Sequence, residues 1–281
     1  MSTPRERQVG VAWGPGLHAP VGDRVDGVAY GRYIGRWSRL FLPTLLNAAE
    51  IRHGDRVLDV ATGTGEAAQQ ALERVGQSGL VVGADISSTM LNEACARLPS
   101  AQFLAVVSDG QSLVFPDATF DVVICQLGLM FFPNPARGLA EFRRVLRPGR
   151  RAAVCVISLA SRAPMWGILA ETLSDYLPGH KKALHLSFSL ADAAKLEGLV
   201  RAAGFSDARV TREVRRDVIS SFDEYWAPIE SGTGSLPQAY LALPEPSRRA
   251  VQARVRERLL RFESGGQLEL SVEMLIASGQ A

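Results

Sequence analysis

The residues most able to do chemistry are those of a glycine-rich turn and an acidic residue about twenty positions after it. The run Val57-Leu-Asp-Val-Ala-Thr-Gly-Thr-Gly65 is typical of a buried strand that enters a tight turn, and Asp85 ends the next apolar run. Glycine lets the backbone turn sharply and approach a ligand closely. An acid about twenty residues further on can accept hydrogen bonds from the hydroxyls of a ribose. This pattern predicts a site for a ligand that contains a nucleoside.

Two classes of nucleoside ligand compete for this turn. Gly63-Thr-Gly-Glu-Ala-Ala68 fits the permissive dinucleotide pattern G-x-G-x-x-G/A, which is a weak signal by itself. Asp59 lies inside the first strand. Its carboxylate would not help to bind an anionic pyrophosphate, but it would attract a cationic ligand. S-adenosylmethionine (SAM) carries an ammonium and a sulfonium group, so Asp59 favours SAM. A structural role for Asp59, in which it caps a turn or pairs with a basic residue, stays open.

Further segments follow the turn in one unbroken order. They are Gly83-Ala-Asp-Ile-Ser-Ser-Thr-Met-Leu91, Ser108-Asp-Gly110, Leu113-Val-Phe-Pro-Asp-Ala-Thr-Phe-Asp-Val-Val-Ile124 and Glu141-Phe-Arg-Arg-Val-Leu-Arg-Pro-Gly149. Together with the turn, they resemble the motifs of the class I SAM-dependent methyltransferases, type 11 group, and are similar to the ubiquinone/menaquinone C-methyltransferases. The resemblance covers roughly residues 50–158. It implies a Rossmann-like α/β fold: a mostly parallel seven-stranded sheet, helices on both faces and helical cap insertions.

The resemblance also implies which residues hold SAM. The turn would cradle the methionine part, with Gln126 near the sulfonium, while Asp85 would take the ribose. Ile86 and Met90 would pack on the adenine, and Asp109 and Gly110 would address its edge. The full implied set is Asp59, Ala61, Thr62, Gly63, Thr64, Gly65, Asp85, Ile86, Met90, Asp109, Gly110 and Gln126. The chain departs from the pattern in that Ala61 stands where many members have a glycine, and Arg150 where a second glycine is common.

Several of these residues have a structural alternative. Asp85 could cap the next helix, although Ser87 or Ser88 can do so. Asp109 could form an Asx turn, and Met90 could belong to the core. Gln126 could simply end a strand.

Methyl transfer from a sulfonium is an in-line displacement that depends mainly on holding the acceptor close and aligned. A base is needed only if the acceptor must lose a proton. His180 and His185 are weak candidates, because an insertion after the fifth strand would overhang the carboxyl ends of the strands, where ligands bind. Exposed loop positions explain both histidines better than catalysis does, so the catalytic residues stay unknown. No metal is expected.

Apolar runs that alternate with helical patterns predict a parallel sheet covered on both faces. The expected domains are an N-terminal segment and lid helix at 1–50, a SAM-binding core at 51–158, and a C-terminal part at 159–281 with the last strands. Helical substrate-cap insertions are expected at about 163–187 and 221–262. Tyr30, Tyr33 and Trp37 fit either a lid over the cofactor or a helix packed on the sheet.

Composition restricts the remaining function classes. A net charge of +2 is too small to indicate nucleic acid as a partner, and the apolar run at 122–132 is too short to span a bilayer. No apolar leader follows Met1, and the three cysteines are scattered singly, so a cytoplasmic protein without stable membrane insertion is expected. A homodimer is possible.

These observations predict a SAM-dependent methyltransferase. Aromatic residues in the expected insertions suggest a small apolar or aromatic methyl acceptor, although they would equally fill an ordinary core. Two alternatives stay open, an NAD(P)-dependent oxidoreductase and a protein of the same fold with a non-methylating, cyclase-like activity.

Overall fold

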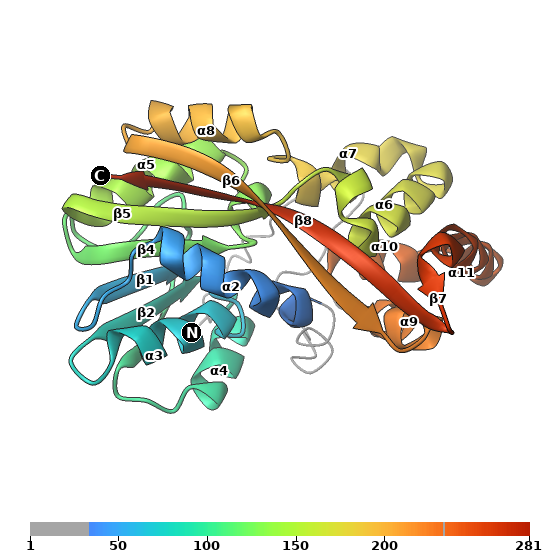
Figure 1. Cartoon of the computed structure of the whole chain (residues 1–281), viewed down its shortest axis with the longest axis horizontal. Helices are drawn as coiled ribbons and strands as arrows, with labels where there is room; N and C mark the ends of the chain where they lie inside the picture. The colour runs from blue at the N-terminus through green and yellow to red at the C-terminus, as the bar shows by residue number, and fades with distance from the viewer. Residues whose placement is uncertain (1–33, 233) are drawn as a thin grey trace, which may run out of the picture.

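One mixed sheet runs through the molecule, in a computed structural model that describes residues 34–232 and 234–281. Its strand order is β3-β2-β1-β4-β5-β8-β6, and the short β7 pairs with β8 (Figure 1). The strands are β1 (Arg56–Val60), β2 (Leu80–Asp85), β3 (Phe103–Val107), β4 (Phe120–Gln126), β5 (Leu146–Ile157), β6 (Ser206–Ile219), β7 (Glu263–Ser264) and β8 (Gln267–Gln280). The first five strands pair in parallel, and β8 runs antiparallel to both β5 and β6. The expected seven-stranded, mostly parallel sheet is confirmed, with β7 as a small addition.

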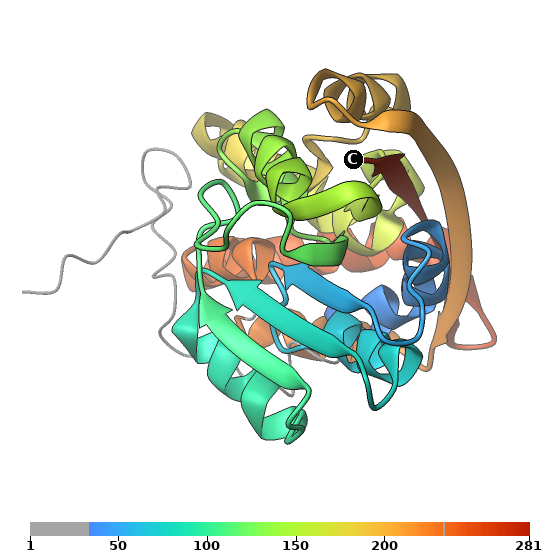
Figure 2. The ribbon, with the colours of Figure 1, turned by 90° about the vertical axis from the view of Figure 1, so that its left-hand side faces the viewer.

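Helices cover both faces of this sheet, as the apolar character of β1 and β4 requires. The helices are α2 (Arg36–Ala48), α3 (Glu66–Val75), α4 (Ser88–Arg97), α5 (Pro135–Val145), α6 (Pro164–Tyr176), α7 (Lys181–Leu184), α8 (Ala193–Ala202), α9 (Phe222–Glu230), α10 (Ser235–Leu241) and α11 (Glu245–Leu259). Helices α2 and α3 contact each other on one face, and α5 and α8 contact each other on the other (Figure 2). The expected cap at Ser87 is confirmed, because its side chain accepts a hydrogen bond from the Met90 amide at the start of α4.

The junction between α5 and β5 has Pro148 and Gly149 within the strand itself. Strand β5 already begins at Leu146, opposite Phe120, and its register with β4 shifts before Arg151. Proline cannot donate a ladder hydrogen bond, so the chain bulges around Pro148. The bulge brings Arg147 and Arg150 to the buried carboxylate of Asp121, at 2.8 and 2.9 Å.

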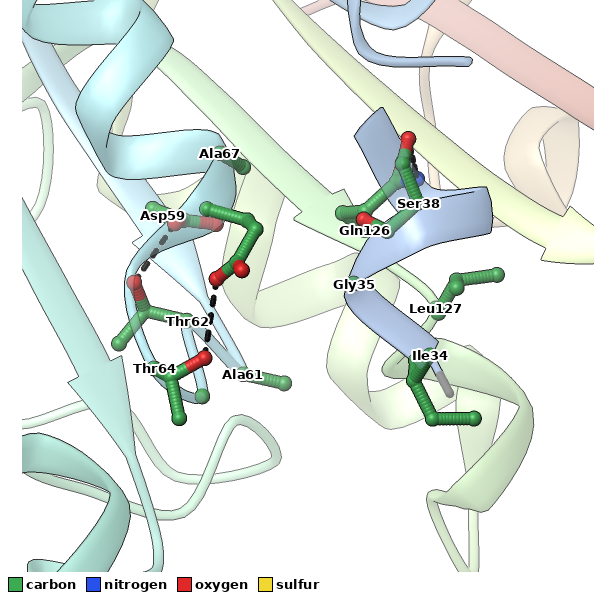
Figure 3. Close-up of a pocket in the computed structure, with 12 residues that line it drawn as sticks. Ile34, Gly35, Ser38, Asp59, Ala61, Thr62, Thr64, Ala67, Gln126 and Leu127 are labelled. Atoms are coloured by element: carbon green, nitrogen blue, oxygen red, sulfur yellow. Dashed lines mark hydrogen bonds between the residues drawn. The ribbon is translucent and has the colours of Figure 1, made fainter. Parts of the chain in front are cut away.

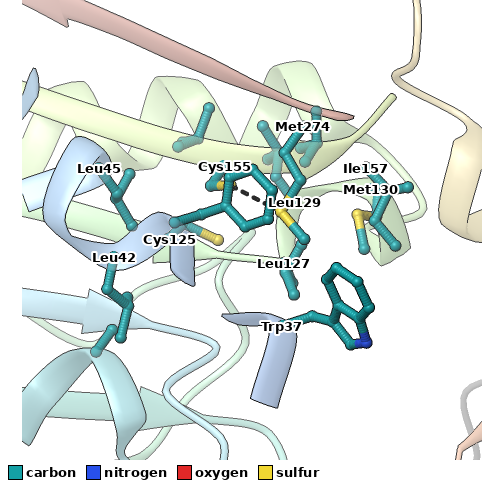
Figure 4. Close-up of a cluster of buried hydrophobic side chains, with 14 of the residues drawn as sticks. Trp37, Leu42, Leu45, Cys125, Leu127, Leu129, Met130, Cys155, Ile157 and Met274 are labelled. Atoms are coloured by element: carbon teal, nitrogen blue, oxygen red, sulfur yellow. Dashed lines mark hydrogen bonds between the residues drawn. The ribbon is translucent and has the colours of Figure 1, made fainter. Parts of the chain in front are cut away.

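A buried apolar cluster joins α2 to the sheet (Figure 4). The side chains in this cluster include Trp37, Leu42, Leu45, Cys125, Leu127, Leu129, Met130, Cys155, Ile157 and Met274. Both cysteines are fully buried and behave as small hydrophobic residues. Burial raises the pKa of Cys125 to about 12, which keeps the thiol protonated. The cluster anchors α2 over the ends of β4 and β5.

Beyond the main sheet, β6 and β8 extend together towards a group of helices that includes α6, α9, α10 and α11 (Figure 1). Aromatic side chains fill the space between these helices. Phe222 stacks on Trp226 with ring centroids 5.5 Å apart, and Tyr240 meets Trp226 edge-on at 5.1 Å. Within the described residues, no helix is long and apolar enough to cross a membrane.

Candidate cofactor site

A pocket opens at the carboxyl end of the sheet, between the turn after β1 and the first turns of α2 (Figure 3). One wall carries Asp59, Thr62 and Thr64, and the opposite wall carries Ser38, Gln126 and Leu127. The lining residues are Ile34, Gly35, Ser38, Asp59, Ala61, Thr62, Gly63, Thr64, Glu66, Ala67, Gln126 and Leu127. The structure thus brings together half of the sequence-predicted set, from β1, its turn and the end of β4.

Asp59 lies at the bottom of this pocket and is fully buried. Its Oδ2 accepts a hydrogen bond of 2.6 Å from the Thr62 hydroxyl, while its Oδ1 has no hydrogen-bond partner among the described residues. Burial raises the pKa of Asp59 to about 7, against the opposing effects of the Thr62 hydrogen bond and of the nearby backbone amide of Ala68. The nearby carboxylates of Asp85 and Glu66 raise it further. A buried acid with a free oxygen is costly unless a cation meets it.

The turn itself has the left-handed backbone that the glycines predict. Gly63 and Gly65 have φ angles of 55° and 85°. Ala61 adopts the same region with φ 58°, although a Cβ costs about 1 kcal/mol there. Ala61 therefore holds a left-handed conformation that would favour glycine.

Asp85 fastens the turn to the end of β2. Its Oδ2 accepts the Gly63 amide at 2.9 Å, and its Oδ1 accepts the Ser87 amide at 2.9 Å. Burial raises the pKa of Asp85, and these backbone hydrogen bonds oppose the rise. The Ile86 backbone amide also stabilises this carboxylate, and a carboxylate has about four acceptor sites, so Asp85 can still accept from a ligand. The ribose contact remains a prediction.

Glu66 lines the pocket although the sequence analysis did not select it. It receives the Thr64 hydroxyl at 2.9 Å and pairs with Arg97 of α4 and Arg39 of α2. Its side chain is only 10% exposed. The sequence offered one signal for Glu66, its position as an acid in the first turn of the helix that follows the glycine turn.

Gln126 connects the end of β4 to α2. Its amide nitrogen donates to the Ser38 carbonyl oxygen at 3.3 Å, and its buried Oε1 has no partner among the described residues. Leu127 follows with a φ of 56°, which turns the chain away from the strand. Gln126 therefore presents a free acceptor in a pocket that also holds Asp59.

The remaining predicted cofactor residues lie along the same edge of the sheet but outside this pocket's lining. Ile86 is 44% exposed directly after β2, and Met90 is half-buried on α4. Asp109 accepts the Gln111 amide at 2.9 Å, so the Asx-turn alternative is present. Gly110 leaves no room for a Cβ, which would lie 2.3 Å from the Phe132 ring. Their adenine contacts stay predictions.

The two histidine candidates lie on either side of α7, outside the pocket lining. His180 precedes α7, and His185 follows it, with Nε2 3.2 Å from the Ser174 hydroxyl. Burial lowers the pKa of His185, which favours its neutral form. The part of the chain that the structure covers holds no cluster of metal-ligating side chains. Tyr30 and Tyr33 fall outside the described residues.

Comparison with known proteins decides the family. Residues 58–154 match the family described as "Methyltransferase domain". The ubiquinone/menaquinone biosynthesis C-methyltransferase UbiE of Teredinibacter turnerae is 33% identical over 189 residues, which make up 61% of this chain and 75% of that protein. This chain belongs to the class I SAM-dependent methyltransferases.

Other relatives of this methyltransferase match a shorter part of the chain. UbiE of Xanthomonas campestris pv. campestris is 39% identical over 126 residues, or 43% of this chain, and the chain spans about half of that protein's length, 48%. Among solved structures, a phosphoethanolamine N-methyltransferase 2 of Haemonchus contortus shares the fold, with a TM-score of 0.57 and 17% identity. That similarity covers 90% of this chain and 57% of the other.

The methyltransferase uses SAM as its cofactor, and the pocket fits this group in two respects. The free oxygens of Asp59 and Gln126 are buried acceptors that a cationic ligand satisfies. The described lining residues include the carboxylates of Asp59 and Glu66 and no basic side chain. A pyrophosphate would meet repulsion here, whereas an ammonium or sulfonium group is attracted.

Proposed function

We propose that this methyltransferase transfers the methyl group of SAM to a small apolar or aromatic molecule, and that the pocket beside the glycine turn binds the methionine part of the cofactor. The single observation that carries the proposal is the unpartnered, buried carboxylate oxygen of Asp59 in a lining without basic side chains. Bound SAM supplies an electrophilic methyl group on a cationic sulfur. The chain's own task is to hold this group and the acceptor in line.

Several residues have proposed roles in that task. Asp59 and Gln126 offer acceptors to the cationic groups, and the turn at 61–65 cradles the methionine part. Asp85 takes the ribose, because its oxygens keep free lone pairs at the end of β2. Ile86, Met90, Asp109 and Gly110 surround the adenine. Displacement at a methyl group needs alignment more than acid–base chemistry, so no side chain is assigned as a base.

We further propose that the acceptor binds beside α2 and Leu127, under a cap made of the insertions at about 163–187 and 221–262. Trp37 of α2 meets Trp166 of α6 edge-on, with ring centroids 6.2 Å apart, so the cap reaches the helix that walls the pocket. The cap aromatics Tyr225, Trp226 and Tyr240 are buried against one another and their neighbours. These three side chains fill the interior of the cap, so support for an apolar acceptor comes instead from the apolar side chains in the pocket lining, Ile34 and Leu127.

The names of the relatives support an aromatic acceptor, since they refer to ubiquinone and menaquinone biosynthesis. The match to the methyltransferase family ends at residue 154, before the cap insertions begin. We therefore propose the class of the acceptor and not its identity.

The first experiment tests the cofactor site. Purified protein is melted with SAM, S-adenosylhomocysteine or NAD, and a ligand at a hundred times its dissociation constant should stabilise it by about 2.7 kcal/mol. We expect stabilisation by the first two and none by NAD. Stabilisation by NAD alone would contradict the proposal and favour an oxidoreductase.

The second experiment tests the reaction. SAM labelled in its methyl group is incubated with the protein and a panel of apolar and aromatic phenols, quinols and amines. Label should move into at least one of these compounds, and Asp59→Asn should slow the transfer. Transfer only to strongly polar or charged acceptors would contradict the proposed acceptor class. Cofactor binding without transfer to any compound would favour the non-methylating alternative.

A further inference from the structure

The methionine part of SAM also carries a carboxylate, which the pocket does not match. The described lining residues include Asp59 and Glu66 but no arginine, lysine or histidine. A carboxylate placed beside two acids needs a cation close by. Among the described residues, two cations lie beside this wall, Arg39 and Arg97, since both pair with Glu66.

Arg97 is already held by several groups of the turn and of α3. Its Nη1 donates to the Thr64 carbonyl oxygen at 2.8 Å and to Glu66, and its Nη2 donates to Gln69 at 3.2 Å. These contacts use its donors within the protein and keep Glu66 neutralised. Arg97 therefore braces the turn and is poorly placed to bind a ligand.

Arg39 has much weaker ties. Its one hydrogen bond within the described residues is a 3.3 Å contact from Nη1 to Glu66, and its side chain is 49% exposed. The ion pair lies directly against the pocket, because a Cβ built on the lining residue Gly35 would lie 2.8 Å from Glu66 Oε1 and 3.1 Å from Arg39 Nη1. A guanidinium has five N–H donors, so Arg39 keeps several free for a carboxylate.

Another arginine of α2 is excluded by its contacts. Arg36 binds Asp217 and Glu224 and donates to the Val218 carbonyl oxygen, which ties the start of α2 to β6 and α9. Arg36 thus holds one side of α2 in place, while Arg39, one turn later, points to the glycine turn.

We propose that Arg39 binds the carboxylate of the cofactor's methionine part, and that it exchanges Glu66 for this carboxylate when the cofactor enters. Arg97 stays on Glu66 during the exchange, so the pocket does not gain an uncompensated charge. The exchange couples the position of α2, which walls the pocket through Gly35 and Ser38, to the presence of cofactor. The inference concerns the cofactor and does not depend on the identity of the methyl acceptor.

Two ligands that differ only in the carboxylate test the exchange by calorimetry. They are S-adenosylhomocysteine and its decarboxylated analogue, S-adenosyl-3-thiopropylamine. Arg39→Gln should weaken S-adenosylhomocysteine about tenfold to a hundredfold, the range for losing a hydrogen bond between charged groups. The same variant should bind the decarboxylated analogue within about twofold of the wild type, and Arg39→Lys should restore part of the lost affinity.

Arg74→Gln is the matched control. Arg74 of α3 also reaches α2, where it donates to the Pro43 carbonyl oxygen at 3.4 Å, but it is not part of the pocket lining. We expect it to leave the affinity for both ligands unchanged. Equal weakening of both ligands by Arg39→Gln would overturn the proposal, because Arg39 would then only hold α2. No weakening of either would overturn it as well, because another group would bind the carboxylate.

A different calorimetric result would contradict the proposed function. If wild-type protein bound neither ligand, the cofactor site itself would be misplaced, and the inference would fall with it. Binding of both ligands with equal affinity by the wild type would overturn only the inference about Arg39.

Discussion

Asp85 accepts the backbone amide of Gly63 at 2.9 Å, and this hydrogen bond joins the end of β2 to the turn after β1. The second oxygen of Asp85 accepts the Ser87 amide and so also sets the start of α4. One carboxylate therefore arranges two segments of the site before any ligand binds. Asp85 therefore has a structural role besides its proposed contact with the ribose. A test of the ribose contact must separate these two roles.

Asp85→Ala should lower the affinity for S-adenosylhomocysteine by about a hundredfold or more, because charged hydrogen bonds to the ribose are lost. Asp85→Asn, which keeps one acceptor oxygen for the Gly63 amide, should lose about tenfold. Calorimetry measures both, and circular dichroism should show a folded protein in each case. Wild-type affinity in the alanine variant would refute the ribose assignment.

Asp59 should make the stability of the ligand-free protein depend on pH. Its pKa is raised from 3.8 to about 7. The folded state therefore binds more protons than the unfolded state between these values, and the free energy of unfolding falls as the pH rises from about 4 to about 7. Each pKa unit is worth about 1.4 kcal/mol, so the loss is a few kcal/mol. Urea unfolding of Asp59→Asn across this range should lack that contribution. The same pH dependence in both proteins would contradict the prediction.

Cofactor binding should release a proton below pH 7. A cationic ligand favours the ionised form of Asp59, whose pKa without ligand is about 7. Affinity for SAM should then fall by up to about tenfold for each pH unit below 7. Calorimetry at pH 6 in two buffers of different ionisation enthalpy would count the protons. Asp59→Asn should release none, and equal release by the variant would assign the proton to another group.

Gly65 should tolerate no side chain. Its φ is 85°, and an added Cβ would lie 2.9 Å from Leu98 Cδ1 and 3.3 Å from Ala94 Cβ. Gly65→Ala should therefore reduce the free energy of unfolding by about 1–3 kcal/mol and weaken cofactor binding. Gly198→Ala in α8 is the control, because open space surrounds that position, and it should stabilise the protein by about 0.5–1 kcal/mol. Urea unfolding compares them, and equal effects would show that the left-handed turn is not required.

Local sequence patterns were sufficient to predict much of the fold and part of the candidate site. The glycine turn, the acid inside the first strand and the Ser87 cap depend on neighbours within a few residues, so the chain's own order encodes them. The alternation of apolar strands and helices predicted the parallel sheet, and the family motifs are concentrated in the same region. The start of β5 at Leu146, ahead of Pro148, depends on its pairing with β4.

Only the tertiary structure revealed the second wall of the pocket. Gly35 and Ser38 come from α2, and Glu66 meets Arg39 and Arg97 from separate helices. Periodicity shows which face of a helix is buried, but it does not show which distant side chain lies opposite. Pairing across long stretches of chain depends on how the helices dock on the sheet. The sequence therefore predicted the glycine turn as the SAM site, and the docking of α2 decided which arginine of that helix lies beside it.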